Sequence, residues 1–163
     1  MAMTPLFKTI TIIAFVLYLL VLVKLTLFRT SVTLFDITFS EQNGYITSLQ
    51  TAFARANFVP FFSIYYYLIS EQEPFIVGLV NVIGNILLYI PYGFLLPLVW
   101  PGAQAFRRTL LLLFLTSAGF EVLQLLFAIG NFDVDDTLLN TLGGGLGFVL
   151  YRTAFRLLRY RVG

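Results

Sequence analysis

The sequence predicts an all-α membrane protein with four transmembrane helices in a single domain, residues 1–163. Of its 163 residues, 59% are hydrophobic and 11% are charged, whereas in soluble domains about a quarter of all residues are charged. The mean hydropathy of +0.90 is that of a membrane protein. Four apolar stretches reach the roughly 20 residues that a helix needs to cross a bilayer: residues 9–28, 75–100, 109–129 and 137–155. These observations exclude a soluble enzyme and a nucleic-acid-binding protein.

The first span follows Lys8 and contains Lys24, and no small-residue cleavage site comes after it. We therefore expect an uncleaved helix rather than a secretory signal. The basic residues predict the orientation, because Lys and Arg are enriched in cytoplasmic loops. Seven of the ten fall on one side of the predicted spans, which places both termini in the cytoplasm: Lys8, Arg107, Arg108, Arg152, Arg156, Arg159 and Arg161.

The long connection on the predicted outer side is residues 29–74. It contains an apolar run, residues 58–69 (FVPFFSIYYYLI), that is too short to span a bilayer, is rich in Phe and Tyr, and includes Pro60. Aromatic rings favour the depth of the lipid headgroups. We expect this segment to be either an interfacial piece on the outer leaflet or a re-entrant piece that shapes a ligand cavity.

Polar residues inside the second and third spans need a partner, a cavity or a function, because hydrocarbon does not solvate them. Asn81 and Asn85 share a face of the second span, where Pro91 and Pro97 interrupt the hydrogen-bond ladder. These amides either join helices or line a site. Glu121 lies midway along the third span, where a carboxylate costs about 2.5 kcal/mol or more unless it is protonated, paired or hydrated.

Gln124 follows Glu121 by three residues and shares its face, so the pair predicts either a functional site or a protonated, hydrogen-bonded structural carboxyl. The fourth span opens with three acidic residues, Asp133, Asp135 and Asp136. Capping by the helix dipole explains some of them. A polar stripe through Asp133, Asp136 and Asn140 continues into the glycines of a small-xxx-small helix contact: Gly143, Gly144 and Gly147.

We expect the polar side chains of the last two spans to converge near the outer leaflet: Glu121, Gln124, Asp133, Asp136 and Asn140. Such oxygen-rich clusters hydrogen-bond a sugar or pyrophosphate headgroup, or hold Mg²⁺ or Ca²⁺, here through Asp133, Asp136 and Glu121. The chain has no His and no Cys, which excludes thiolate nucleophiles, disulfides and Cys/His zinc sites.

Three ordered runs resemble the VanZ-like family: residues 81–96 (NVIGNILLYIPYGFLL), 120–130 (FEVLQLLFAIG) and 133–144 (DVDDTLLNTLGG). The upstream residues Asn57, Pro60 and Phe61 match the family's N-x-x-P-F element. The matched motif positions in the three runs are Asn85, Pro91, Gly93, Glu121, Gln124, Asp133, Asp136, Asn140 and Gly143. Many members carry an Arg just before the first Asp, where this chain has Asn131 and Phe132.

The resemblance implies a protein of the bacterial plasma membrane that lowers susceptibility to teicoplanin and related lipoglycopeptides. Its implied partners are the lipid bilayer and a lipoglycopeptide or lipid-linked cell-wall precursor, and we expect no catalysis, no nucleic acid and no required cofactor. Two alternatives stay open. One is an intramembrane enzyme that uses the carboxylates for acid–base or Mg²⁺ chemistry on a lipid-linked substrate. The other is a small oligomeric transporter with Glu121 as its ion site.

Overall fold

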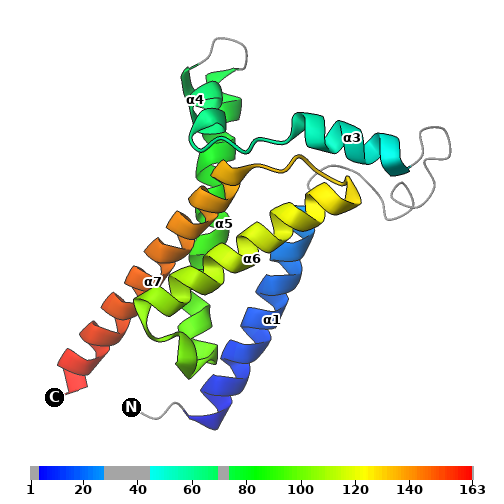
Figure 1. Ribbon diagram of the computed structural model, residues 1–163. Coiled ribbons are helices and arrows are strands. Elements are labelled where there is room, and N and C mark those ends of the chain that lie inside the picture. The colour runs from blue at the N-terminus through cyan, green and yellow to red at the C-terminus, as the bar shows by residue number, and fades with distance from the viewer. Residues whose placement is uncertain (1–3, 28–44, 70–73, 163) are drawn as a thin grey trace.

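Every regular element formed by the described residues, 4–27, 45–69 and 74–162 of a computed structural model, is helical, which confirms the all-α prediction (Figure 1). The remaining positions of the predicted loop 29–74 lie outside the described residues. The long helices are α1 (Pro5–Leu27), α5 (Phe75–Val99), α6 (Phe106–Phe127) and α7 (Val134–Val162). The shorter elements are α3 (Tyr45–Arg55), α4 (Phe62–Ile69) and a 3-10 turn, η1 (Pro101–Ala103).

Three helices of the described chain, α1, α5 and α6, are long and apolar enough to cross a membrane. They have 23, 25 and 22 residues, which corresponds to roughly 33 to 38 Å of helix. Helix α7 is longer, with 29 residues, but it is not among the three. Glycines, Asn140 and the arginines lower its apolar content. The fourth span, residues 137–155, therefore stays a prediction.

The four long helices form a bundle in which α7 makes its most extensive contact with α5 and its next with α6. Both chain ends and the α5–α6 connection lie at one end of this bundle (Figure 1). Helices α3 and α4 and the connection from α6 to α7 lie at the opposite end, which we call the α3–α4 end (Figure 1). The aromatic segment, residues 58–69, is located there and forms the turn before α4 and then α4 itself.

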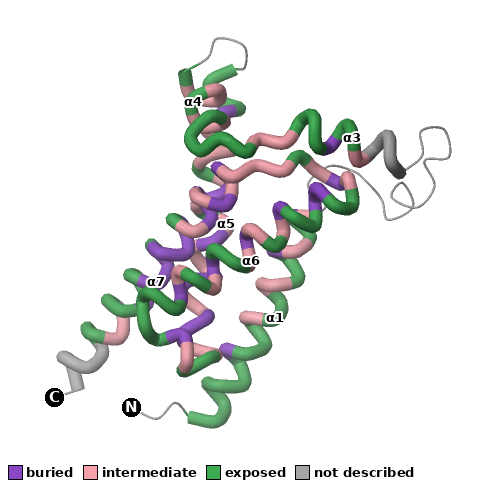
Figure 2. Tube along the Cα trace, in the orientation of Figure 1, coloured by how far each residue is buried: buried purple, intermediate pink, exposed green. Residues whose placement is uncertain are grey.

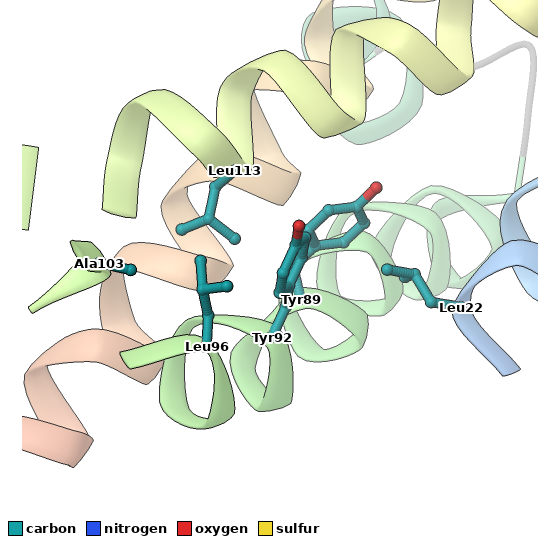
Figure 3. Close-up of a cluster of buried hydrophobic side chains, with 6 residues drawn as sticks. All are labelled: Leu22, Tyr89, Tyr92, Leu96, Ala103 and Leu113. Atoms are coloured by element: carbon teal, nitrogen blue, oxygen red, sulfur yellow. The ribbon is translucent and has the colours of Figure 1, made fainter. Parts of the chain in front are cut away.

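The bundle has a small buried core and an apolar exterior. Figure 3 shows the core cluster: Leu22 from α1, Tyr89, Tyr92 and Leu96 from α5, Ala103 from η1 and Leu113 from α6. In Figure 2 the buried positions face the inside of the bundle, and the outward faces of the long helices are exposed. Large apolar side chains on those faces, such as Leu17, Leu87 and Leu115, are about 56 to 58% exposed. In water this surface would be costly, whereas lipid accepts it.

Glycines bring the backbones of α5 and α7 into direct contact. A Cβ added at Gly93 would lie 1.7 Å from the carbonyl oxygen of Gly144, and one at Gly143 would lie 2.0 Å from that of Ile86. Gly147 stands in the same relation to Ile90. The glycine stripe of α7 thus packs on α5. Because the two helices lie so close together, the polar side chains near the start of α7 lie next to those of α5.

Candidate functional site

The α3–α4 end is assembled around the chain that links α6 to α7. Helix α6 stops at Ala128, which adopts a left-handed conformation with φ 52° and caps the helix through its N–H. The chain then turns back toward the bundle, and the N–H of Asp133 donates to Glu121 Oε2 at 2.8 Å. Glu121 is 2% exposed. Its carboxyl therefore holds the start of α7 against α6.

A second contact holds this link to the segment before α4. Asn57 and Asp133 form an isolated parallel bridge, with backbone bonds from Asn57 N–H to the Phe132 carbonyl (2.8 Å) and from Val134 N–H to the Asn57 carbonyl (3.1 Å). The Asn57 Nδ2 atom also donates to Asp133 Oδ1 at 2.9 Å and to Ser63 Oγ at 3.0 Å. The N-x-x-P-F element thereby contacts residues 133–136 at the start of α7, which we call the acidic turn.

Asp135, one of the three acidic residues for which the sequence left capping open, anchors α4. Its Oδ1 accepts the N–H of Phe61 at 2.5 Å, and its Oδ2 accepts those of Ser63 and Ile64 at 2.8 and 3.2 Å. Phe61 has φ 66°, a left-handed conformation that is uncommon outside glycine. Asp135 is 1% exposed. Of these three residues it is Asp133 that caps α7, since its Oδ1 accepts the Asp135 N–H at 2.9 Å.

Amide side chains bond the four long helices to one another. Asn85 of α5 donates to Asp136 Oδ1 of α7. Gln124 of α6 donates to the carbonyl of Thr26 in α1 at 2.6 Å. Deeper in the bundle, Asn140 of α7 donates to Ser117 Oγ of α6 at 2.8 Å. Each predicted site amide therefore has a structural bond to a second helix.

Part of the predicted cluster lines a cavity of about 260 Å³ at the α3–α4 end, between the ends of α1, α5, α6 and α7. Gln124, Asp133 and Asp136 belong to its wall. Glu121 and Asn140 do not line it: the first is buried behind Asp133, and the second lies one turn further along α7. The other lining residues are Thr26, Leu27, Tyr67, Asn81, Ile129, Gly130 and Asn131.

Sequence reasoning missed Thr26 and Tyr67 as site residues. Thr26 lies in the predicted apolar span 9–28, where the residues three and four positions before it, Val23 and Leu22, are apolar, so no pattern within the span indicates it. Tyr67 is one of several consecutive tyrosines, and nothing in the sequence separates it from Tyr65 or Tyr66. Their positions depend on how α1 and α4 pack on the bundle.

The predicted metal ligands are not gathered as a metal site in the described part of the chain. No group of three or more Asp, Glu, His or Cys side chains is placed there to hold an ion. The side chain of Asp133 instead accepts a bond from Asn57, and that of Asp136 accepts one from Asn85. Glu121 accepts the backbone N–H of Asp133. The expectation of Mg²⁺ or Ca²⁺ gains no support from this geometry.

Fold and site together define a helical membrane protein whose buried polar side chains hold an acidic cavity at one end of the bundle. The chain belongs to the VanZ/LLP1 family, whose model matches residues 15–158. It is similar to Protein VanZ of Enterococcus faecium, with 38% identity over 71 residues, which is 44% of this chain and 44% of that protein. No solved structure matches the chain.

Proposed function

We propose that this protein is a multi-pass protein of the bacterial plasma membrane, with both termini cytoplasmic, that lowers susceptibility to teicoplanin and related lipoglycopeptides. It does so without catalysis, by binding the drug or its lipid-linked cell-wall target at the outer surface. The observation that supports this proposal is the cavity at the α3–α4 end, whose wall contains Gln124, Asp133 and Asp136.

The distribution of charge supports the orientation. Of the seven basic residues whose side chains are described, five lie toward the end of the bundle where the termini and the α5–α6 connection lie, and two, Lys24 and Arg55, lie toward the α3–α4 end. The five are Lys8, Arg107, Arg108, Arg152 and Arg156. The cavity and the acidic turn lie at the opposite end. Because basic residues favour the cytoplasmic side, the cavity then opens toward the cell exterior, where lipoglycopeptides meet their target.

The contacts of the carboxylates support binding rather than acid–base chemistry. Asp133 caps α7 and accepts from Asn57, and Asp136 accepts from Asn85. Such bonds fix the two carboxylates in place. The volume also sets a limit, because cavities that enclose drug-sized ligands hold roughly 300 to 1,000 Å³. About 260 Å³ suits a headgroup or one substituent of a lipoglycopeptide.

The test is the susceptibility of a sensitive Gram-positive host to teicoplanin and vancomycin. One strain expresses the intact chain, one carries Asn131→Lys at the exposed mouth of the cavity, and one carries Ala54→Lys on α3. Both substitutions add one cation at an exposed position of the α3–α4 end, but Ala54 does not line the cavity.

We expect the intact chain and Ala54→Lys to raise teicoplanin tolerance more than vancomycin tolerance, and Asn131→Lys to lose that effect. An intact chain that reaches the membrane and leaves both susceptibilities unchanged would overturn the proposed function. If the Asn131→Lys strain tolerates teicoplanin as well as the strain with the intact chain, and the two proteins are equally abundant in the membrane, then the phenotype does not depend on the cavity.

A further inference from the structure

We infer that α4 and the start of α5 lie in the lipid headgroup region of the membrane leaflet at the α3–α4 end, with lipid on both outer sides. We call residues 62–69 and 74–80 the α4–α5 hairpin. Its place in the leaflet is independent of the proposed resistance role. Of the two roles that the sequence left open for residues 58–69, the exposed side chains of α4 then take the interfacial one.

The exposed residues of the α4–α5 hairpin are all apolar or aromatic. On α4, Phe62, Tyr65 and Ile69 are 55 to 64% exposed, and their spacings of three and four place them on one face. On α5, Ile76 and Val80 are 63 and 62% exposed. The other exposed residues of the hairpin are Pro74, Phe75 and Val77. Such a surface is costly in water, so an apolar medium or partner covers it.

Helix α5 carries this surface without a break into the part of the helix that crosses the bilayer. Ile76, Val80, Ile83 and Leu87 follow one another at spacings of four, three and four and form one stripe. All four are exposed, by 43 to 63%. Because lipid contacts the stripe at Leu87, continuity of the same surface brings lipid to Ile76 and Val80.

The apolar surface lies on both outer sides of the hairpin. The two helices touch through their backbones, since a Cβ added at Gly78 would lie 2.1 Å from the carbonyl oxygen of Tyr67. Gly78 is two residues from both Ile76 and Val80, which places the α5 stripe about 200° around the helix from α4. A docked protein covers one side and brings a polar rim, whereas lipid covers both sides and needs no rim.

The length of α5 places the hairpin at headgroup depth. The helix has 25 residues, or roughly 38 Å, whereas the hydrocarbon core is about 30 Å thick. Trp100, at the other end, is 51% exposed, and Trp favours the interface. Counting about 20 residues back from Trp100 reaches Val80. The residues before Val80, and α4 beside them, then occupy the headgroup layer, which is roughly 5 to 7 Å deep.

Buried contacts hold the hairpin in this position. The Asp135 carboxylate, which is 1% exposed, accepts the N–H groups of Phe61, Ser63 and Ile64, and the Gly78 contact holds α4 against α5. Figure 1 shows α4 beside the first turns of α5 at the α3–α4 end. Helix α4 also supplies Tyr67 to the cavity wall, so the lipid contact and the cavity share one helix.

The experiment measures tryptophan fluorescence of the full chain in phosphatidylcholine vesicles. Trp100 is the single Trp of the chain, so Trp100→Phe provides a background without fluorescence from Trp. Tyr65→Trp and Val80→Trp report on the two sides of the hairpin. Leu87→Trp is the matched control, because it lies on the same stripe roughly 10 Å further along α5.

The quenchers are phosphatidylcholines brominated close to the glycerol backbone or near the middle of the acyl chain, which we call the shallow and the deep lipid. Iodide in the buffer reports contact with water, and free N-acetyltryptophanamide gives the value for full exposure. All three Trp positions replace exposed side chains, so the substitutions leave the buried core unchanged.

We expect Tyr65→Trp and Val80→Trp to lose more fluorescence to the shallow lipid than to the deep lipid, and Leu87→Trp to show the reverse order. Iodide should quench both hairpin positions less than the free tryptophan derivative. Absence of lipid quenching at Tyr65→Trp would overturn the inference: strong iodide quenching would then place α4 in water, and weak iodide quenching would place it against another protein chain. Stronger quenching of either hairpin position by the deep lipid would also overturn it, because the hairpin would then lie in the hydrocarbon core.

Discussion

Asn57 and Asp133 are 76 positions apart in the chain and are joined by a 2.9 Å bond from the Asn57 amide to Asp133 Oδ1. The backbone bridge beside this bond and the stacked rings of Phe58 and Phe132, with centroids 4.8 Å apart, strengthen the junction. Asn57 therefore connects the segment before α4 to the start of α7.

Replacing Asn57 should destabilise the protein in a graded way. Asn57→Ala removes the side-chain bonds to Asp133, Ser63 and the Val59 N–H, and we expect a loss of about 2 to 3 kcal/mol. Asn57→Asp should cost more, because it sets a second carboxylate against Asp133. Thermal unfolding in detergent measures both variants. Equal melting temperatures for Asn57→Asp and the unmodified chain would contradict the role of Asn57 in joining the segment before α4 to α7.

Asp135→Asn should release the start of α4. The carboxylate accepts three backbone N–H groups from residues 61, 63 and 64, while an amide has one acceptor oxygen and presents its own donors to the rest. We expect a loss of about 2 to 4 kcal/mol, since buried donors lose their partners. Amide hydrogen exchange should become faster at Phe61, Ser63 and Ile64. Unchanged exchange at these three positions would count against the anchor.

Gly93→Ala should disrupt the packing of α5 on α7. The added methyl would meet the Gly144 carbonyl, and because the obstacle is backbone, the helices must separate at a cost of about 1 to 3 kcal/mol or more. Gly119→Ala is the matched control, because nothing lies within 4 Å of its new Cβ. In an exposed helix position that change should be neutral or stabilising by up to about 1 kcal/mol. Thermal unfolding of the two variants provides the comparison, and similar melting temperatures would argue against the glycine contact.

Glu121 should tolerate an amide but not an apolar side chain. Glu121 accepts the Asp133 N–H, and Glu121→Gln keeps an acceptor oxygen at that place, whereas Glu121→Leu does not. We expect Glu121→Gln to retain both thermal stability and the teicoplanin phenotype, and Glu121→Leu to lose both. Loss of the phenotype in a fully stable Glu121→Gln protein would show that the ionisable group itself is required.

The orientation can be read with single cysteines, because the native chain has none. Gln104 is exposed in the α5–α6 connection, and Asn131 is exposed at the α3–α4 end. A membrane-impermeant thiol reagent should label Asn131→Cys in intact cells and Gln104→Cys only after permeabilisation. The reverse pattern would place the cavity in the cytoplasm.

The general fold was predictable because hydrophobicity along the chain is a local property. Apolar stretches of the required length indicated α1, α5 and α6, and the structure has helices there. The small residues of α7 predicted a close helix contact, and they lie against α5. Helix α7 shows the limit of this reasoning, since the same glycines and polar residues that make it pack on α5 lower the apolar signal of a span.

The polar residues could be named from the sequence, but their partners could not. Helical spacing placed Glu121 beside Gln124, yet in the fold Glu121 binds the Asp133 backbone and Gln124 binds Thr26 on α1. Nothing in the sequence indicated that Asp135 anchors α4. The composition and periodicity of this chain determined that it forms apolar helices with a few costly polar groups. Which donor meets which carboxylate was decided by tertiary structure, because hydrogen bonds act over about 3 Å and join segments that only the packed bundle brings together.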